Sequence, residues 1–549
     1  MAQQLYFSRD TRMFLQFRNT TDNTETSTDL GKGALWEIPV LDGYSFSQTT
    51  NTSEITLAEM ESSAGVSRRG RRMFTDSLAP AEWSFSTYIR PFKSLGQDNV
   101  TSGTKAAETG TTSEVHAVEE ALWASMFGAD KYTSQKFVRN VQPVSGSETD
   151  VIAPGANNSV ITIGESNRSA LHSFVLYFLI DTDTDNPLLY RLPEAIVNEV
   201  TVDFDVDGIA TLNWSGFAKE IQDRTENVKT NAGTTVAVAN AHGTGSNLAL
   251  GDIVIDTNNS RAVHIANTVT GTNAVLTQAI DESTTSTQNF IRNRLTAVDI
   301  EAADGADKVS GTFPGSFVTI TGLTKADPAV ATATAHGFAV GDVVRVTGTC
   351  GITTGGTDVL NGQDLTITAV ATNTFTIGAL DTSGSSGSFS GTPVAANGKY
   401  GLTLTGGSFN IGNNITYLVP EELGAINKPL EHVTGTRTAT GNATCYLTLE
   451  DTDTSAGTSR QFFNDLVGTG AMNKVVNKFK VTMHIGGSAA TGNNTDPALK
   501  IIFPTAHIEV PTHSVEDVIS LETNFTALPT DFGSANEITE VRYYPPSSY

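Results

Sequence analysis

The sequence has few of the side chains from which disulfide frameworks, metal sites or catalytic motifs are usually built. Cys350 and Cys445 are the only cysteines among 549 residues, and no Cys-x-x-Cys motif or cysteine–histidine cluster occurs. We therefore expect two buried free thiols in a reducing compartment, not a disulfide or a zinc site. The Gly-x-Ser-x-Gly nucleophile motif and the Gly-x-x-x-x-Gly-Lys-Ser/Thr phosphate loop are also missing, so no enzyme activity is predicted.

Long apolar segments are missing as well. The most apolar run, residues 174–180, is far shorter than the roughly 20 residues that a helix needs to cross a bilayer. Residues 1–14 lack the apolar core of a secretory signal peptide. We therefore expect a protein that is made in the cytoplasm and has no membrane partner.

Basic residues are scarce relative to acidic ones. The chain has 34 lysines and arginines against 59 aspartates and glutamates, which gives a formal net charge of −25. Tight nucleic-acid binding needs a basic surface, so sequence-specific DNA or RNA recognition is not expected. A strongly negative surface repels polyanions and would let a nucleic acid slide past without sticking.

Glycine and small polar residues are abundant instead. Hydrophobic residues make up 38 % of the chain and charged residues 17 %, whereas there are 49 glycines. This composition favours a mainly β fold with many turns. Period-two alternation predicts a strand at 82–90, and a long hairpin whose arms, 196–206 and 209–217, flank an Asp207-Gly208 turn. Two short helices are predicted, at 113–128 from apolar residues at helical spacing and at 459–468 with Ser459 as cap.

An internal repeat divides the chain. Residues 237–255 (AVANAHGTGSNLALGDIVI) and 331–346 (ATATAHGFAVGDVVRV) share Ala-x-Ala-His-Gly followed by Gly-Asp-Ile/Val-Val. They predict two small β-barrel-like modules inserted into surface loops, which costs little loop entropy and should leave each module removable. His242 and His336 have no further metal ligands nearby, so a structural role in a turn is expected. The predicted organisation is a β core at 1–224, a module at 225–289, a core segment at 290–302, a module at 303–398 and a core at 399–549.

No cofactor or metal is predicted from the acidic clusters. The segment 181–186 (DTDTDN) resembles the start of a calcium loop, but the glycine at position six and the glutamate at position twelve are absent. Its place after a strand suits a solvated turn.

A long charged loop, residues 54–80, contains the most basic group of this acidic chain, the four arginines between Arg68 and Arg72. It could be a solvated loop or a nucleic-acid contact, although the net charge opposes the second. We prefer an intersubunit ion-pair loop, because a subunit of charge −25 must offset repulsion when it assembles. The residues expected to contact a neighbouring subunit are Arg68, Arg69, Arg71, Arg72 and Phe74.

Four core segments, in this order, resemble the tail tube protein of long-tailed bacteriophages. They are 54–92, 189–217 (LYRLPEAIVNEVTVDFDVDGIATLNWSGF), 290–300 (FIRNRLTAVDI) and 400–447. The resemblance implies a two-sheet β barrel or sandwich flanked by a helix. It further implies that six copies form a ring, that the inner sheets join around a lumen, and that the rings stack into a tube. The family's long loop, which reaches an adjacent ring or subunit, corresponds here to 54–80.

The resemblance also implies partners and a location. The subunit would lie in the virion tail, with the tape measure, terminator and baseplate proteins and, if the tail is contractile, a sheath. Viral DNA would pass through without specific binding, and the candidate lumen-facing residues are Glu199, Asp203 and Asp205. The two modules would have to project outward. The alternatives are another phage protein (baseplate, decoration or adhesin) that binds the host surface, and, less favoured, a polysaccharide-active enzyme.

Overall fold

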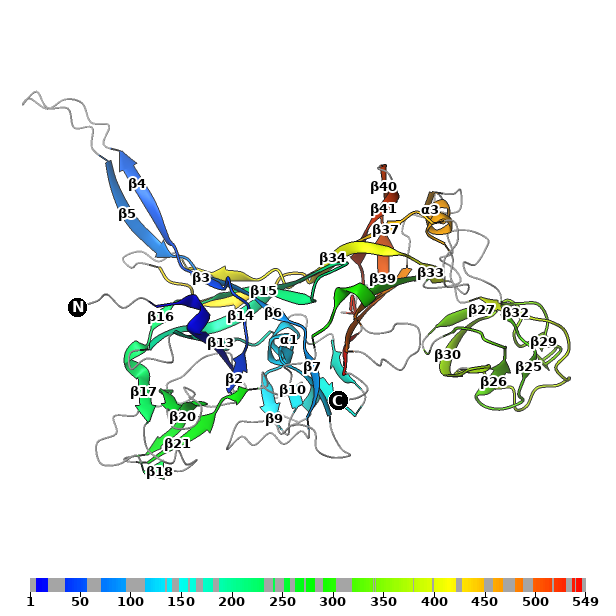
Figure 1. Cartoon of the computed structure of the whole chain (residues 1–549), viewed down its shortest axis with the longest axis horizontal. Coiled ribbons are helices and arrows are strands. Elements are labelled where there is room, and N and C mark those ends of the chain that lie inside the picture. The colour runs from blue at the N-terminus through cyan, green and yellow to red at the C-terminus, as the bar shows by residue number, and fades with distance from the viewer. Residues whose placement is uncertain are drawn as a thin grey trace, which may run out of the picture. The chain divides into compact units, whose positions relative to one another are not determined.

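The computed structural model shows a mainly β protein, as predicted (Figure 1). In the part of the chain that it describes, no helix is long and apolar enough to cross a membrane. The described residues are 6–17, 35–56, 71–94, 114–133, 136–140, 148–156, 158–163, 171–180, 187–231, 240–241, 251–256, 262–270, 273–281, 290–302, 318–338, 340, 342–378, 380–396, 399–420, 427–448, 458–467, 479–486, 497–515, 518–529, 536–538 and 540–545.

The chain forms two compact units, each assembled from separate stretches of sequence. Unit 1 contains residues 1–201, 211–288 and 411–437. Unit 2 contains residues 202–210, 289–410 and 438–549.

An antiparallel sheet forms the centre of unit 1. β1 (Thr11–Gln16) lies between β2 (Leu35–Ile38) and β13 (Phe174–Ile180), and β13 pairs in turn with β14 (Leu188–Asp205). The six residues of β13 from Phe174 to Leu179 are all buried, because apolar side chains on both faces suit a strand that is covered on both sides.

A second set of strands in unit 1 carries the predicted alternating pattern. β6 (Ala81–Tyr88) pairs on one edge with β3 (Ser45–Ser47) and on the other with β15 (Thr211–Ala218), whose full length it follows. Trp83 and Phe85 on β6 are buried, whereas Glu82 is exposed and Ser84 and Ser86 are half-buried. The short helix α1 (Glu120–Met126) is buried throughout.

Unit 2 contains a corresponding sheet. β23 (Ala297–Ala302) lies between β33 (Lys399–Gly401) and β38 (Phe479–Gly486), and β38 pairs with β39 (Ala498–Ile508). The other strands and the helix of this core are β34 (Leu404–Gly412), β37 (Thr438–Tyr446), β41 (Ile519–Ala527), which pairs with β37, and α3 (Ser459–Val467).

The core is therefore a tandem repeat, which the sequence analysis does not anticipate. The pairs β1–β2, β1–β13, β13–β14 and β6–β15 recur as β23–β33, β23–β38, β38–β39 and β37–β41, all antiparallel. In chain order the first repeat is β1, β2, β3, the ribbon β4–β5 (Thr50–Thr56 and Arg71–Leu78), β6, α1, β13, β14 and β15, and the second is β23, β33, β34, the ribbon β35–β36 (Thr416–Leu418 and Glu431–Val433), β37, α3, β38, β39 and β41.

The two inserted modules differ in how they are anchored. The second forms its own seven-stranded sheet and encloses its own apolar core, in which every member lies between Val318 and Ala395. The first shares its core with unit 1: Ile253, Ile255 and Ile265 belong to the same buried cluster as Tyr177 of β13. The first module is therefore part of the packing of unit 1, which the prediction of a freely removable module does not foresee.

Equivalent backbone bonds support the predicted module repeat. Asp252 accepts a hydrogen bond from the N–H of Ala266 at 2.9 Å through its main-chain oxygen, and Asp342 accepts one from Ile367 at 2.9 Å. His336 is buried in its turn: its Nδ1 accepts from the N–H of Phe338, so Nε2 donates to the oxygen of Ala371 at 2.8 Å. This confirms a turn-structural role for His336, while His242 lies outside the described residues.

The helix predictions are partly wrong. Residues 114–117 form strand β8 (Glu114–Ala117), which pairs with β7 (Pro91–Ser94), and the helix starts only at Glu120. Residues at helical spacing in so short a segment are also compatible with a buried strand, and that alternative holds here. Ser459 does not cap α3; its hydroxyl donates to the oxygen of Tyr446 and accepts from the N–H of Thr448.

The remaining elements complete the described chain. They are η1 (Ser8–Asp10), β9 (Lys131–Thr133), β10 (Lys136–Asn140), β11 (Glu148–Pro154), β12 (Ser159–Thr162), β16 (Gln222–Asp223), η2 (Thr225–Asn227), β17 (Val228–Asn231), β18 (Asn240–Ala241), β19 (Ile253–Asp256), β20 (Ala262–Thr270), β21 (Asn273–Gln278), β22 (Ile280–Asp281), η3 (Asn293–Leu295), β24 (Val318–Thr319), β25 (Gly322–Leu323), β26 (Ala329–Thr332), β27 (Val343–Thr347), β28 (Thr353–Thr354), β29 (Thr357–Asp358), β30 (Asp364–Ala371), β31 (Thr374–Ile377), β32 (Val394–Ala396), β40 (Thr512–Val515) and β42 (Glu540–Tyr544).

Candidate functional site

The predicted loop, residues 54–80, overlaps a two-stranded ribbon. β4 and β5 pair antiparallel from Thr50 opposite Leu78 to Thr56 opposite Arg71 (Figure 1). All residues of β4 and the first six of β5 are exposed. The prediction of a loop is therefore wrong for residues 71–78, because a strand exposed on both faces carries no burial pattern. Arg68 and Arg69 lie outside the described residues.

One of the predicted contact arginines is already paired within the ribbon. The Arg71 guanidinium holds the Glu54 carboxylate by two hydrogen bonds, one of them Nη2 to Oε2 at 2.6 Å. The bond from Arg71 lowers the pKa of Glu54 below its ordinary value. The charge of Arg71 is therefore neutralised by Glu54 on the paired strand. The guanidinium of Arg72 lies over the Phe74 ring, 5.6 Å from its centroid.

The ribbon exposes apolar side chains that a solvated loop would not need. Ile55, Met73 and Phe74 are 55 %, 66 % and 43 % exposed. The register places Ile55 and Phe74 on one face of the ribbon and Met73 on the other, so both faces present apolar area. A two-stranded hairpin is marginally stable by itself in water. These features favour a ribbon that a partner covers.

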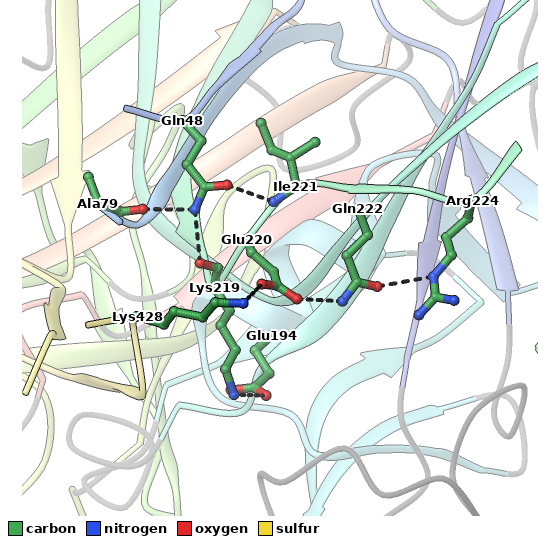
Figure 2. A network of polar contacts seen from close by, with 9 residues as sticks. All are labelled: Gln48, Ala79, Glu194, Lys219, Glu220, Ile221, Gln222, Arg224 and Lys428. Carbon is green, nitrogen blue, oxygen red and sulfur yellow. Dashed lines mark hydrogen bonds and ion pairs between the residues drawn. The ribbon is translucent and has the colours of Figure 1, made fainter. Parts of the chain in front are cut away.

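A polar network fixes the base of the ribbon (Figure 2). The Gln48 side chain donates to the oxygens of Ala79, at 2.8 Å, and Lys219, at 3.3 Å, and its Oε1 accepts from the N–H of Ile221 at 3.0 Å. It thereby ties both the entry and the exit of the ribbon to the end of β15. Sequence analysis misses Gln48, since its partners lie 31, 171 and 173 positions away and no local signal marks them.

The network continues through charged groups of the same unit. Glu220 accepts from the Gln222 amide at 2.6 Å and lies 3.7 Å from the Lys428 ammonium (Figure 2). Lys219 donates to the Glu194 carboxylate at 3.0 Å. Lys428 comes from the segment between β35 and β36, so the second ribbon is anchored at the base of the first.

The second ribbon, β35–β36, buries one side chain, Tyr417, and half-buries His432, while its other four residues are exposed. Ile415 and Tyr417 belong to an apolar cluster with Leu171 and Ile196, against which Phe217 packs. The Tyr417 hydroxyl donates to the main-chain oxygen of Glu194, and burial raises its pKa well above the ordinary value.

His432 completes this contact. Its Nε2 donates to the main-chain oxygen of Leu171 at 3.3 Å. Burial lowers the pKa of His432, so the imidazole is neutral at pH 7 and can act as this donor.

The candidate lumen residues lie in the C-terminal half of β14. Asp203 and Asp205 are exposed and Glu199 is half-buried, while Val202 and Phe204 between them are buried. Asp205 also accepts from the N–H of Gly208 at 2.7 Å and so stabilises the turn. The alternation that predicts one acidic face is present; which space that face lines stays a prediction.

Among the described residues, no group of three histidine, cysteine, aspartate or glutamate side chains is arranged to hold a metal. Cys350 and Cys445 are buried free thiols, as predicted.

Comparison with known proteins shows which kind of protein the sequence is similar to. No family model matches the chain. It is 23 % identical over 536 residues to the tail tube protein pb6 of Escherichia phage T5, which covers 97 % of this chain and 75 % of that protein. The resemblance to phage tail tube proteins is confirmed. The similarity spans core and modules alike and supports a structural protein of the phage tail.

Proposed function

We propose that this protein is the major subunit of a phage tail tube, which assembles as closed rings that stack into the conduit for DNA ejection. Similarity to a tail tube protein over 97 % of the chain carries the proposal. The β core supports it, because sheets that join edge to edge around a ring leave no edge exposed to aggregate.

The ring contains six tube repeats. The family resemblance predicts six copies with one repeat each, whereas the doubled strand order of this chain favours three copies with two repeats each. The copy number per ring distinguishes the two.

The ribbon is the contact to the neighbouring subunit. Its exposed apolar side chains, Phe74 among them, supply contact area. Of the predicted contact arginines, Arg68, Arg69 and Arg72 supply charge to the neighbour, whereas Arg71 is paired with Glu54 of its own ribbon. The chain's net charge of −25 suits a lumen through which DNA passes without binding. The tube ends meet the tape measure, terminator and baseplate proteins, and both modules face outward, toward a sheath where one exists.

Negative-stain electron microscopy of the purified protein tests this function. We expect rings or tubes, and native mass spectrometry of single rings should give three chains, or six if each chain supplies one repeat. A protein that stays monomeric at high concentration, with its fold intact by circular dichroism, would refute the proposal.

A further inference from the structure

The structure contains one complete contact between its own repeats, which we call the internal joint. The end of β14, residues 202–205 of the first repeat, belongs to unit 2, where β14 pairs with β34. Within unit 1, the N–H of Asn413 donates to the main-chain oxygen of Asn198 and the N–H of Ile415 to its side chain, both at 2.7 Å. The second repeat thus adds its β34 strand and its ribbon to β14 of the first.

The apolar side chains of the internal joint are buried. Phe204, Ile415 and Tyr417 are 5 %, 7 % and 8 % exposed. The Phe204 ring lies over Gly407, where a Cβ atom would come within 2.7 Å of Cζ, so only glycine allows this approach. The joint combines strand addition with apolar burial, the two contributions that a stable sheet contact needs.

The repeat assigns a counterpart to each side of this joint. Leu188, Pro193 and Ala195 in the first repeat correspond to Leu499, Pro504 and Ala506 in the second, at identical spacing. Counting on by the same spacing pairs Phe204 with Val515, on β40. On the other side, the Ile-Thr-Tyr run at Ile415 corresponds to the Ile-Thr-Leu run at Ile55 on β4.

Both counterparts are exposed. Val515 is 76 % and Ile55 is 55 % exposed, against 5 % and 7 % for their equivalents. All four residues of β40 are exposed; it pairs on one edge with β41, and Val518 beyond it is 59 % exposed. The chain therefore carries one filled joint and the two unfilled halves of another.

We infer that these halves meet between copies: the β3 edge and β4–β5 ribbon of one chain dock on β39–β41 of the next, reproducing the internal joint. This inference rests on the proposed ring and identifies its contact surfaces. The contact is head-to-tail, so it joins different surfaces and closes only when a ring is complete.

Cysteine crosslinking between copies tests the contact. In the internal joint, Phe217 packs against the cluster that contains Ile415. Their counterparts are Thr526, which occupies the position of Phe217 in the matching strand β41, and Ile55. Ile55→Cys and Thr526→Cys chains are purified separately, mixed, assembled and treated with a short bismaleimide. We expect a crosslinked dimer from the mixture and none from either variant alone.

The chain supplies matched controls. Cys350 and Cys445 are buried, and burial raises the pKa of Cys445 to about 12, so the native thiols stay unreactive. Val370→Cys, at an exposed site of the second module, replaces Thr526→Cys in the control mixture and should give no dimer. Rings that form without the Ile55–Thr526 crosslink would overturn this inference and leave the proposed function standing, whereas absence of any ring would overturn the function itself.

A charge on the open edge gives a second readout. Val515→Asp should abolish ring formation while the circular dichroism spectrum and melting temperature of the monomer stay unchanged, since Val515 is exposed there. Val370→Asp should assemble normally. Normal rings from the Val515→Asp variant would contradict the assignment of β40 as the receiving edge.

Discussion

Two isoleucines at equivalent positions allow the repeat to be tested by one substitution made twice. Ile415 is 7 % exposed in the internal joint and Ile55 is 55 % exposed on the free ribbon. Ile415→Ala removes buried methyl groups and should lower the free energy of unfolding by roughly 2–5 kcal/mol. Ile55→Ala removes a mostly exposed side chain, so the monomer should change by no more than about 0.5 kcal/mol.

For assembly, in contrast to monomer stability, Ile55→Ala should have a measurable effect. Complete burial of an isoleucine side chain contributes about 1.5–3 kcal/mol, and about half of Ile55 is still exposed in the monomer. Docking of the ribbon should therefore lose about 1 kcal/mol per joint in Ile55→Ala, which is roughly a fivefold weaker joint. Urea unfolding of the monomer measures the first quantity, and the critical concentration for assembly by sedimentation measures the second.

Two outcomes of these measurements would refute the equivalence of Ile55 and Ile415. An Ile55→Ala monomer as unstable as Ile415→Ala would mean that the ribbon already packs on its own chain. A monomer and a critical concentration that both match the unsubstituted protein would mean that no partner covers Ile55.

Three further outcomes are expected. Gln48→Ala should cost about 0.5–1.5 kcal/mol, since it removes hydrogen bonds to half-buried groups at the ribbon base, and should speed amide exchange at Ile221; unchanged exchange would argue that Gln48 does not hold the ribbon base. Because the pKa of His432 is lowered in the folded protein, the stability that the neutral imidazole contributes is present above pH 6.5 and is lost as the pH falls below that value. In urea unfolding measured on both sides of pH 6.5, His432→Gln should remove this dependence of the midpoint on pH. Deletion of 305–397 should leave a folded, assembling core because the second module has its own apolar cluster, whereas deletion of 228–288 should unfold unit 1 by exposing the cluster that Tyr177 shares with it; solubility and circular dichroism distinguish the two.

Buried features of the fold could be predicted from sequence, and exposed ones could not. The alternation around Trp83 and Phe85 predicts β6 because one face is covered. The β4–β5 ribbon escapes the same reasoning because both its faces are exposed in the monomer, so selection for burial leaves no period-two pattern. Its pairing register, and with it the Arg71–Glu54 contact, follows from a register shift between Asn51 and Thr52 that no local pattern indicates.

The duplication of the core could not be predicted from the sequence for a different reason. The second module is inserted between β23 and β33, whereas β1 and β2 of the first repeat are separated by a short segment, so equivalent strands lie at different spacings along the chain. Few identities survive, such as Pro193 with Pro504 and Ala195 with Ala506. The modules kept their Ala-His-Gly turn because its geometry is demanding: Ala335 and Gly337 both have positive φ, of 50° and 67°.

A doubled subunit changes how a ring forms. An internal joint closes within one chain, so it forms during folding at the high effective concentration that a covalent linkage provides. A joint between chains must also offset the translational and rotational entropy of association. In the proposed ring of doubled subunits, only alternate joints would carry that cost, and we infer that these are the joints that contain Ile55 and Val515, which are exposed in the single chain. Assembly would then depend on the open joints alone, which is why substitutions there should change ring formation while substitutions in the internal joint change folding.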